Sequence, residues 1–183
     1  MEINLEKEDI LNFWFKECAP DQWFKKDNVF DNLLEKRFKG TVELALEGKL
    51  DNWTDSGNGI LALILLLDQF TRNIFRDKPR SFSGDVRALS LSFLCTENGY
   101  FFIENVYWRY FMLMPMMHSE DIVVQNNSLP LFKKLGLDDV YDYALKHRDI
   151  VERFGRFPHR NSIIGRKSTK EELEFLKQKG SSF

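Results

Sequence analysis

The chain has 183 residues, 43% hydrophobic and 30% charged, with ten glycines and five prolines, which is the profile of one globular domain with a sizeable core over residues 1–183. Its net charge is -2 and its pI about 6.0, whereas a nucleic-acid groove would more usually bring a basic domain, so nucleic acid is not expected as a partner. Cys18 and Cys95 lie in apolar contexts without a paired spacing. This pattern suggests neither a disulfide framework nor a zinc knuckle and predicts buried free thiols.

Two apolar stretches, 60–67 and 100–117, do not predict a membrane span. The first has only eight residues, and Glu104, Arg109 and Pro115 interrupt the second, whereas a span requires about 20 uninterrupted apolar residues. No apolar N-terminal segment with a small-residue cleavage site marks the chain for export. We therefore expect a cytoplasmic protein that makes no contact with a membrane.

Helical periodicity runs through the chain, and no stretch alternates convincingly enough to be a strand. Glycine, proline and capping residues mark the ends of the expected helices. Pro115 should kink or shorten the fifth helix, and Pro130 is an irregularity in the sixth. The predicted helices cover residues 8–18, 27–47, 60–74, about 81–97, 103–117, a stretch after 121, 140–154, and a last one that begins at the capping boxes of 168–172 and ends near 178. The predicted fold class is all-α.

The third predicted helix, 60–74, is apolar nearly all round, which indicates an element surrounded by other helices. At its C-terminal end Asp68, Arg72 and Arg76 repeat every four residues and so share one face. Buried polar side chains need hydrogen-bond partners, so these three residues either pair with each other or line a cavity.

Positive charge gathers in one segment. Residues 147–166 contain five arginines, two histidines, two glycines and a proline. The guanidinium groups therefore lie along a segment whose backbone should turn sharply twice. Across 146–170 eight Lys or Arg stand against two acidic residues, a local charge of +6 in a chain of net charge -2. This pattern favours a polar pocket for a small anion over a polyanion site.

The histidines are the candidates for proton transfer. His147 lies on the apolar stripe of the 140–154 helix, so it is either a satisfied core histidine or the wall of a pocket, while Asp149 and Arg153 should form an i,i+4 pair. All three histidines stand beside charged residues. The candidate proton donors or orienters are His118, His147 and His159, with Glu120 beside them as the fourth candidate catalytic residue.

The candidate ligand-binding residues are carboxylates and arginines that could converge with these histidines. Arg72, Arg156 and Arg160 would be anion forks, and Asp68 and Glu120 would hold the arginines in place. The full set is Asp68, Arg72, Arg76, Arg109, Arg153, Arg156, Arg160 and Arg166.

Two other interpretations of these residues were considered: an ion-pair network, which stays open, and a metal site, which is not predicted. The charged residues could instead form a buried ion-pair network that only fixes helix register. A metal site from His118, Glu120, His147 and Asp149 lacks a recognised ligand spacing, so no metal is predicted. No glycine-rich phosphate loop, Gly-x-Ser-x-Gly elbow or Cys-x-x-Cys is present, and no cofactor is predicted.

The motifs together carry a resemblance to a known family. The stretches 65–76, 117–121, 147–161 and 165–169, with Phe13-Trp14-Phe15 near the N-terminus, resemble the bacterial family known as domain of unknown function 924 over nearly the whole chain. Thr71 stands where proline is usual. The resemblance implies an all-helical fold similar to tetratricopeptide-repeat proteins, an irregular stack of antiparallel helical hairpins here because no 34-residue period is found. It implies no established activity, so no catalytic residue is carried over.

These observations lead to two hypotheses about function. In the first, an Arg/His-rich pocket binds a small anionic ligand, either a phosphate or carboxylate compound or a peptide carboxylate, with catalysis left open. In the second, the helical stack is an interaction module that binds a partner peptide, and the charged network is structural. The first predicts that the site residues converge on one concavity. The oligomeric state is left open.

Overall fold

The computed structural model describes residues 5–102 and 105–182, and that part of the chain is helical and contains no strand. The all-α prediction is confirmed. The chain divides into two compact units, Met1–Arg76 with Arg80–Pro115 and Asp77–Pro79 with Met116–Phe183. A single domain over residues 1–183 stays a prediction. None of the described helices has both the length and the apolar character needed to cross a bilayer.

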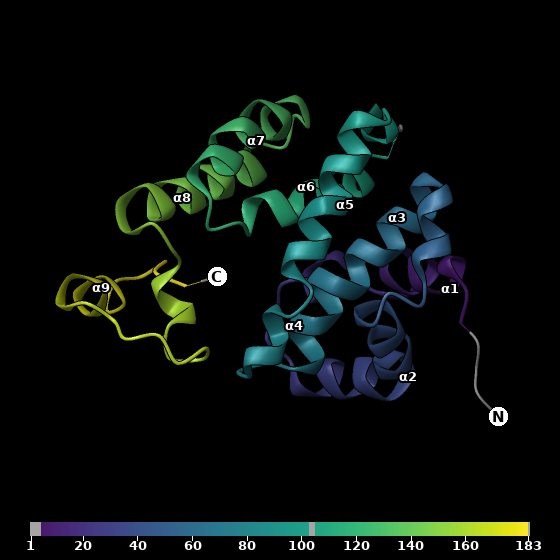
Figure 1. The fold of residues 1–183 in the computed structure, drawn as a ribbon, viewed down its shortest axis with the longest axis horizontal. Helices are drawn as coiled ribbons and strands as arrows, with labels where there is room; N and C mark the ends of the chain where they lie inside the picture. The colour runs from purple at the N-terminus through teal and green to yellow at the C-terminus, as the bar shows by residue number, and fades with distance from the viewer. Residues whose placement is uncertain (1–4, 103–104, 183) are drawn as a thin grey trace. The chain divides into compact units, whose positions relative to one another are not determined.

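The first unit contains the helices α1 Lys7–Asn12, α2 Asn28–Leu46, α3 Gly57–Ile64, α4 Thr71–Ile74, α5 Asp85–Glu97 and most of α6 Val106–Met117 (Figure 1). Two π-helical segments belong to the same unit: Phe13–Glu17 continues α1, and Leu65–Phe70 joins α3 to α4. The expected helix start at Ile103 lies outside the described residues.

The continuous helical run 57–74 forms the centre of the first unit, as the sequence predicted. Every residue from 59 to 71 is buried, and the run packs against α1, α2 and α5. The run begins at Ser56, whose side chain accepts the N–H of Gly59 as an N-cap. Burial of each large apolar side chain stabilises the fold by about 1.5–3 kcal/mol, so this run contributes strongly to the core.

Aromatic rings from the N-terminal segment complete that core. Trp14 is fully buried and lies 5.3 Å from Phe70 and 5.7 Å from Phe111 between ring centroids. Phe13 lies 4.7 Å from Phe38 of α2. Cys18 and Cys95 are both buried and free, as expected, and burial raises the pKa of each thiol to about 12.

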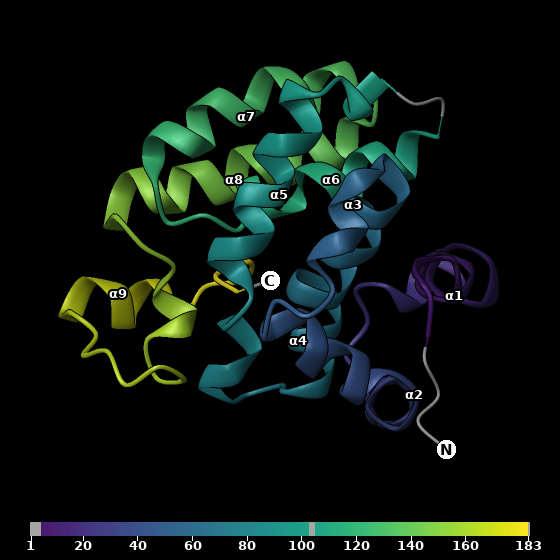
Figure 2. The same cartoon turned by 45° about the vertical axis from the view of Figure 1, so that its right-hand side comes forward.

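The second unit contains a helical hairpin and a short terminal helix. Helix α7 (Ile122–Lys134) and α8 (Asp138–Phe154) are joined by a short turn and lie side by side in both views (Figures 1 and 2). Helix α9 (Lys170–Phe175) follows the arginine-rich segment. The hairpin fits the predicted antiparallel arrangement, while a tetratricopeptide-like stack stays a prediction.

Both prolines lie inside helices. Helix α6 continues through Pro115 to Met117, the end that the sequence predicted, so Pro115 does not shorten it. Pro130 does not end α7, which continues to Lys134. The last helix ends at Phe175, a little earlier than the position near residue 178 that the sequence suggested.

The close approach of α5 to the central run gives a testable consequence. A Cβ at Gly84 would overlap the carbonyl oxygen of Leu67, which already accepts the hydroxyl of Thr71 at 2.8 Å. We therefore expect Gly84→Ala to lower the free energy of unfolding by about 1–3 kcal/mol. Chemical denaturation of the dilute protein measures this change.

Gly40 provides the matched control for Gly84→Ala. It lies inside α2, and a Cβ there would meet nothing within 4 Å. Gly40→Ala should be neutral, or stabilising by up to about 1 kcal/mol, because alanine is the better helix former. Equal effects of the two substitutions would contradict the packing described for Gly84.

Candidate functional site

The arginine-rich segment begins where α8 ends. Gly155 adopts the left-handed conformation (φ 68°), and its N–H donates to the carbonyl of Val151 at 2.8 Å. Pro158–Arg160 forms a 3-10 turn, and Gly165 is again left-handed (φ 72°). A Cβ is disfavoured at positive φ, so these glycines produce the two sharp turns that the sequence predicted.

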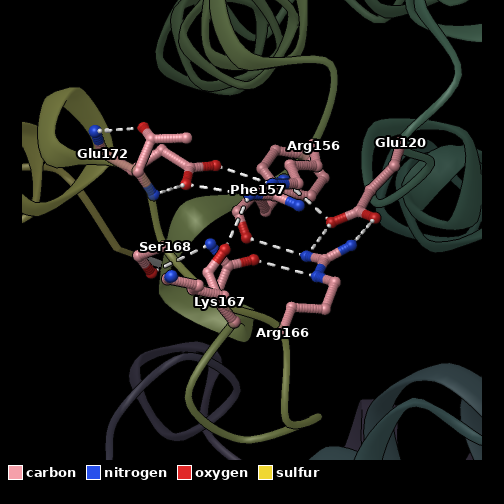
Figure 3. Close-up of polar contacts among 9 residues, drawn as sticks. Glu120, Arg156, Phe157, Arg166, Lys167, Ser168 and Glu172 are labelled. Atoms are coloured by element: carbon pink, nitrogen blue, oxygen red, sulfur yellow. Dashed lines mark hydrogen bonds and ion pairs between the residues drawn. The ribbon is translucent and has the colours of Figure 1, made fainter.

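The carboxylate of Glu120 holds this segment in place (Figure 3). It accepts the N–H of Phe157 at 2.8 Å and two N–H groups of Arg166 at 2.5 and 2.8 Å. Arg166 also donates to Asn161 Oδ1 at 2.8 Å. Partial burial acts to raise the pKa of Glu120, but the bonds from Arg166 and Phe157 outweigh it, and the pKa lies below its usual value.

A second carboxylate, Glu172 at the start of α9, holds Arg156 (Figure 3). Glu172 is 2% exposed and accepts Arg156 Nε at 2.6 Å and Nη2 at 2.9 Å. It also accepts the N–H of Thr169 at 2.7 Å, which completes the predicted capping box. The bond from Arg156, followed by that from Thr169, lowers the pKa of Glu172 to about 2 although burial opposes it.

All three histidines of the chain lie around the buried ring of Phe157 or beside one another. The His147 and His159 rings are 5.6 and 5.7 Å from Phe157, and the His118 ring is 6.1 Å from His147. The guanidinium of Arg160 lies 4.7 Å over Phe157 and donates to the carbonyl of His118 at 3.0 Å. We call these five residues the histidine–arginine cluster.

His147 is the most deeply buried member of the cluster's imidazoles, as its place on the apolar stripe of α8 predicted. Its Nδ1 lies 2.7 Å from the carbonyl of Tyr143, and because a carbonyl only accepts, Nδ1 carries the proton. The pKa of His147 is lowered to about 3, mainly by burial and then by the positive charge of His118, with smaller contributions from His159 and Arg160. His147 is therefore neutral at pH 7, with Nε2 unprotonated.

Other predicted site residues belong to the first unit and pair there. Arg72 donates to the Asp68 carbonyl at 2.6 Å and lies 3.0 Å from the carboxylates of both Asp68 and Asp85. Burial opposes its charge, yet these carboxylates hold the pKa of Arg72 above its ordinary value. The amide of Gln69 also donates to Asp68. Asp68 thus holds an arginine in place, as predicted.

The remaining candidates of the first unit lie in different surroundings. Arg76 donates to Asp31 at 2.6 and 2.8 Å, and Asn73 donates to the same carboxylate. Arg109 is half-buried on α6, and its Nε has no hydrogen-bond partner in the part of the chain that the structure describes. Arg76 is therefore committed to a structural pair.

One predicted ion pair on α8 is wrong. Arg153 donates to Glu171 at 2.8 and 2.9 Å, and Asp149 lies 3.0 Å from Arg148 instead of pairing with Arg153. The partner of Arg153 comes from α9, and a spacing rule within one helix cannot anticipate a partner from a distant segment.

The second unit therefore brings together seven of the predicted residues, while four belong to the first. The gathered residues are His118, Glu120, His147, His159, Arg156, Arg160 and Arg166. Sequence reasoning missed Phe157 and Asn161 as organisers of the segment, and Asp31 and Asp85 as partners of Arg76 and Arg72. Glu172 was also missed as the partner of Arg156, although the capping box in the sequence had marked this residue as the start of the last helix.

The described residues show no metal cluster at these side chains. Across 5–102 and 105–182 no three His, Cys, Asp or Glu residues are placed to hold a metal ion. A cavity of about 290 Å³ lies in the first unit and is formed by other residues. They are Ala19, Asp21, Gln22, Lys25, Asp27 and Phe30.

Residues 10–180 match the model of a family described as bacterial protein of unknown function, DUF924. This chain belongs to the DUF924 family. A solved structure that resembles this DUF924 chain is a protein of unknown function from Agrobacterium tumefaciens, 40% identical with a TM-score of 0.88 over 93% of this chain and 96% of that one. No curated protein matches. The resemblance predicted from the motifs is confirmed.

The buried neutral His147 gives this DUF924 protein a defined pH dependence. The folded-state pKa of about 3 lies below the ordinary 6.5, so as the pH falls the unfolded chain binds the proton first. Stability should decline from pH 6.5 toward 3 by up to about 1.4 kcal/mol per pH unit. Urea denaturation at several pH values measures this decline.

A neutral replacement separates this effect from that of the carboxylates. Glu172 has a lowered pKa of about 2, so its contribution is lost only below about pH 4.5. His147→Gln should flatten the decline between pH 6.5 and 4.5 and leave the steeper acid limb. Equal slopes for both proteins in that range would show that His147 titrates normally.

The contacts of Arg156 give a second prediction. Arg156→Ala removes the bidentate partner of a carboxylate that is 2% exposed, so unfolding should become easier because Glu172 keeps its charge without compensation. Arg153→Ala is the control, since the Arg153 and Glu171 side chains are 51% and 63% exposed and such pairs contribute at most about 1 kcal/mol. Thermal melts in which the control is the more destabilising variant would contradict the structural role of Arg156.

Proposed function

We propose that the histidine–arginine cluster binds a small anion, a phosphate or carboxylate compound, with Arg160 as the cation and the imidazoles as hydrogen-bond partners. The observation that carries this proposal is the gathering of all three histidines and a buried arginine around Phe157 from segments up to about 40 residues apart. Clusters of this type bind and polarise anions when a ligand replaces their hydration.

The electrostatics of the cluster support an anion and not a cation. Burial keeps His147 neutral, and the neighbouring His118, His159 and Arg160 add to that effect. Burial penalises a charge of either sign, so only the coulombic contributions of His118, His159 and Arg160 favour an anion here. Neutral His147 also has an unprotonated Nε2, so an acid–base role for the cluster is chemically accessible.

Arg156 and Arg166 have a supporting role in this proposal. Each is bonded twice to a carboxylate of the same unit, Glu172 and Glu120 respectively. An arginine that is already bidentate to a carboxylate gains little from a second anion. In this proposal Arg160, which lies over the ring of Phe157, and the imidazoles contact the ligand.

The alternative function, an interaction module, is favoured by the same bidentate pairs. If every cation of the segment is structural, the segment serves to fix α9 and the α7–α8 hairpin, and a partner must bind elsewhere. The two functions differ in one measurable property. Only the first predicts that a small anion stabilises the folded protein.

Ligand-dependent melting tests the proposal. Phosphate, nucleotides, dicarboxylates and short peptides would be added to the wild type, and at least one should raise the melting temperature, since a ligand at about 100 times its Kd adds about 2.7 kcal/mol. Arg160→Lys should abolish most of this rise because the guanidinium fork is lost. Arg153→Lys, at an exposed site, is the matched control and should keep it.

Two results would contradict the anion site. One is the absence of any stabilising compound in the panel at millimolar concentrations. The other is an equal rise in melting temperature for the wild type and Arg160→Lys, which would place the anion at a different surface. Imidazole proton shifts of the three histidines, recorded during the titration, identify the site directly.

A further inference from the structure

The cavity of about 290 Å³ in the first unit is formed by the chain from the 3-10 turn Pro20–Gln22 to the first turn of α2. Its walls carry charges of both signs, the carboxylates of Asp21 and Asp27 and the ammonium of Lys25. The buried ring of Phe30 adds an apolar surface. Ligand pockets usually have volumes of about 300–1,000 Å³, so a ligand that fits this cavity is small.

The opposite charges around this cavity do not pair with each other. Within 5–102 and 105–182 no ion pair joins Lys25 to either carboxylate, although all three side chains come from seven consecutive residues. Exposed lysines elsewhere do pair with a carboxylate that is near in the sequence, because Lys39 and Lys177 each lie 2.7 Å from a glutamate, Glu35 and Glu174 respectively. The cavity therefore offers separate charges of both signs to a ligand.

Contacts with the backbone hold the walls of the cavity in place. The side chain of Gln22 accepts the N–H of Ala19 at 2.8 Å and so closes the 3-10 turn. Asp27 is the N-cap of α2, and its Oδ1 accepts the N–H groups of Val29 and Phe30 at 2.8 and 3.3 Å. Its other oxygen, Oδ2, makes no hydrogen bond to the part of the chain that the structure describes. A carboxylate fixed in this way can accept a ligand donor at little cost in side-chain entropy.

We propose that this cavity binds a small zwitterion, an α-amino acid, whose ammonium group meets Asp21 and Asp27 and whose carboxylate meets Lys25. The N-terminal end of α2 offsets part of the negative charge of Asp27. A ligand with one charge of each sign therefore matches the walls better than a simple amine or a simple carboxylate does. The apolar side chain of the amino acid would lie against Phe30. The cavity belongs to the first unit, so this proposal does not depend on the histidine–arginine cluster.

A matched set of three compounds tests the need for both charges. Leucine carries both, 4-methylpentanoate lacks its ammonium group, and 3-methylbutylamine lacks its carboxylate. Each compound would be titrated into the wild type while NMR follows the backbone amide signals of residues 19–30. Leucine should shift these signals with a Kd on the order of 1–10 mM, because the charges of the cavity are largely exposed. Each analogue should bind at least about fivefold more weakly, since one charge-assisted hydrogen bond is lost.

Two charge-removing variants assign the groups of the ligand to their partners. In Lys25→Met the partner of the carboxylate is lost, so leucine should bind no more tightly than 3-methylbutylamine. In Asp27→Asn the charge is lost but α2 keeps its cap, because asparagine is as good an N-cap as aspartate. This variant should bind leucine at least about fivefold more weakly than the wild type. Lys36→Met is the control, because Lys36 is exposed on α2 and does not line the cavity.

Three results would overturn the amino-acid site. Amide signals of residues 19–30 that do not respond to leucine at about 100 mM would mean that the cavity binds no such ligand. Equal affinities of the wild type for leucine and 3-methylbutylamine would mean that Lys25 has no part in binding and that the cavity takes a simple cation. Equal weakening by Lys36→Met and Lys25→Met would attribute the effect to net charge. Shifts confined to the signals of the second unit would place leucine at the histidine–arginine cluster instead.

Discussion

The carboxylate of Glu120 is the constraint on which the second unit depends. It stands just before α7 and accepts three hydrogen bonds from a segment more than thirty residues away, one from the backbone of Phe157 and two from Arg166. These bonds fix the backbone at Phe157, and the ring of that residue is where the histidines and Arg160 meet. A negatively charged group therefore organises a predominantly positive site.

This arrangement explains how a segment so rich in arginine folds without self-repulsion. Glu120 and Glu172 each hold one guanidinium in a bidentate contact, and both carboxylates have a lowered pKa because of those contacts. Arg160 is placed differently, buried over an aromatic face with a backbone carbonyl as an acceptor. Under the proposed function Arg156 and Arg166 support the fold, and Arg160 contacts the ligand.

Local patterns in the sequence predicted the features that depend on neighbouring residues. The period of the apolar residues predicted the central helical run, the stripe on α8 predicted that His147 faces inward, and Thr169 with Glu172 predicted the last helix start. The choice of ion-pair partner was not predictable in the same way. Arg153 selects Glu171 of α9 and Arg72 selects Asp85 of α5, and tertiary contacts decide such pairs, not spacing along one helix.

The π-helical segment Leu65–Phe70 was also beyond the sequence pattern. A π-helix has more residues per turn than an α-helix, but where nearly every residue is apolar this change does not alter the hydrophobic pattern. The periodicity therefore could not distinguish the two kinds of helix. It places fully buried Asp68 beside Gln69 and Arg72. The gathering of the three histidines was predicted as a hypothesis from their charged neighbours, but their common contact with Phe157 required the tertiary structure.

Imidazole nitrogen spectra of the wild type and Glu120→Gln, recorded at pH 7, test most directly whether Glu120 organises the cluster. In the wild type His147 should be neutral with the proton on Nδ1, as its contact with the Tyr143 carbonyl requires. In Glu120→Gln the segment loses its charged acceptor, and the His147 and His159 signals should shift and broaden, whereas Glu171→Gln should change neither. Unaltered histidine signals in Glu120→Gln would contradict the central role assigned to this carboxylate.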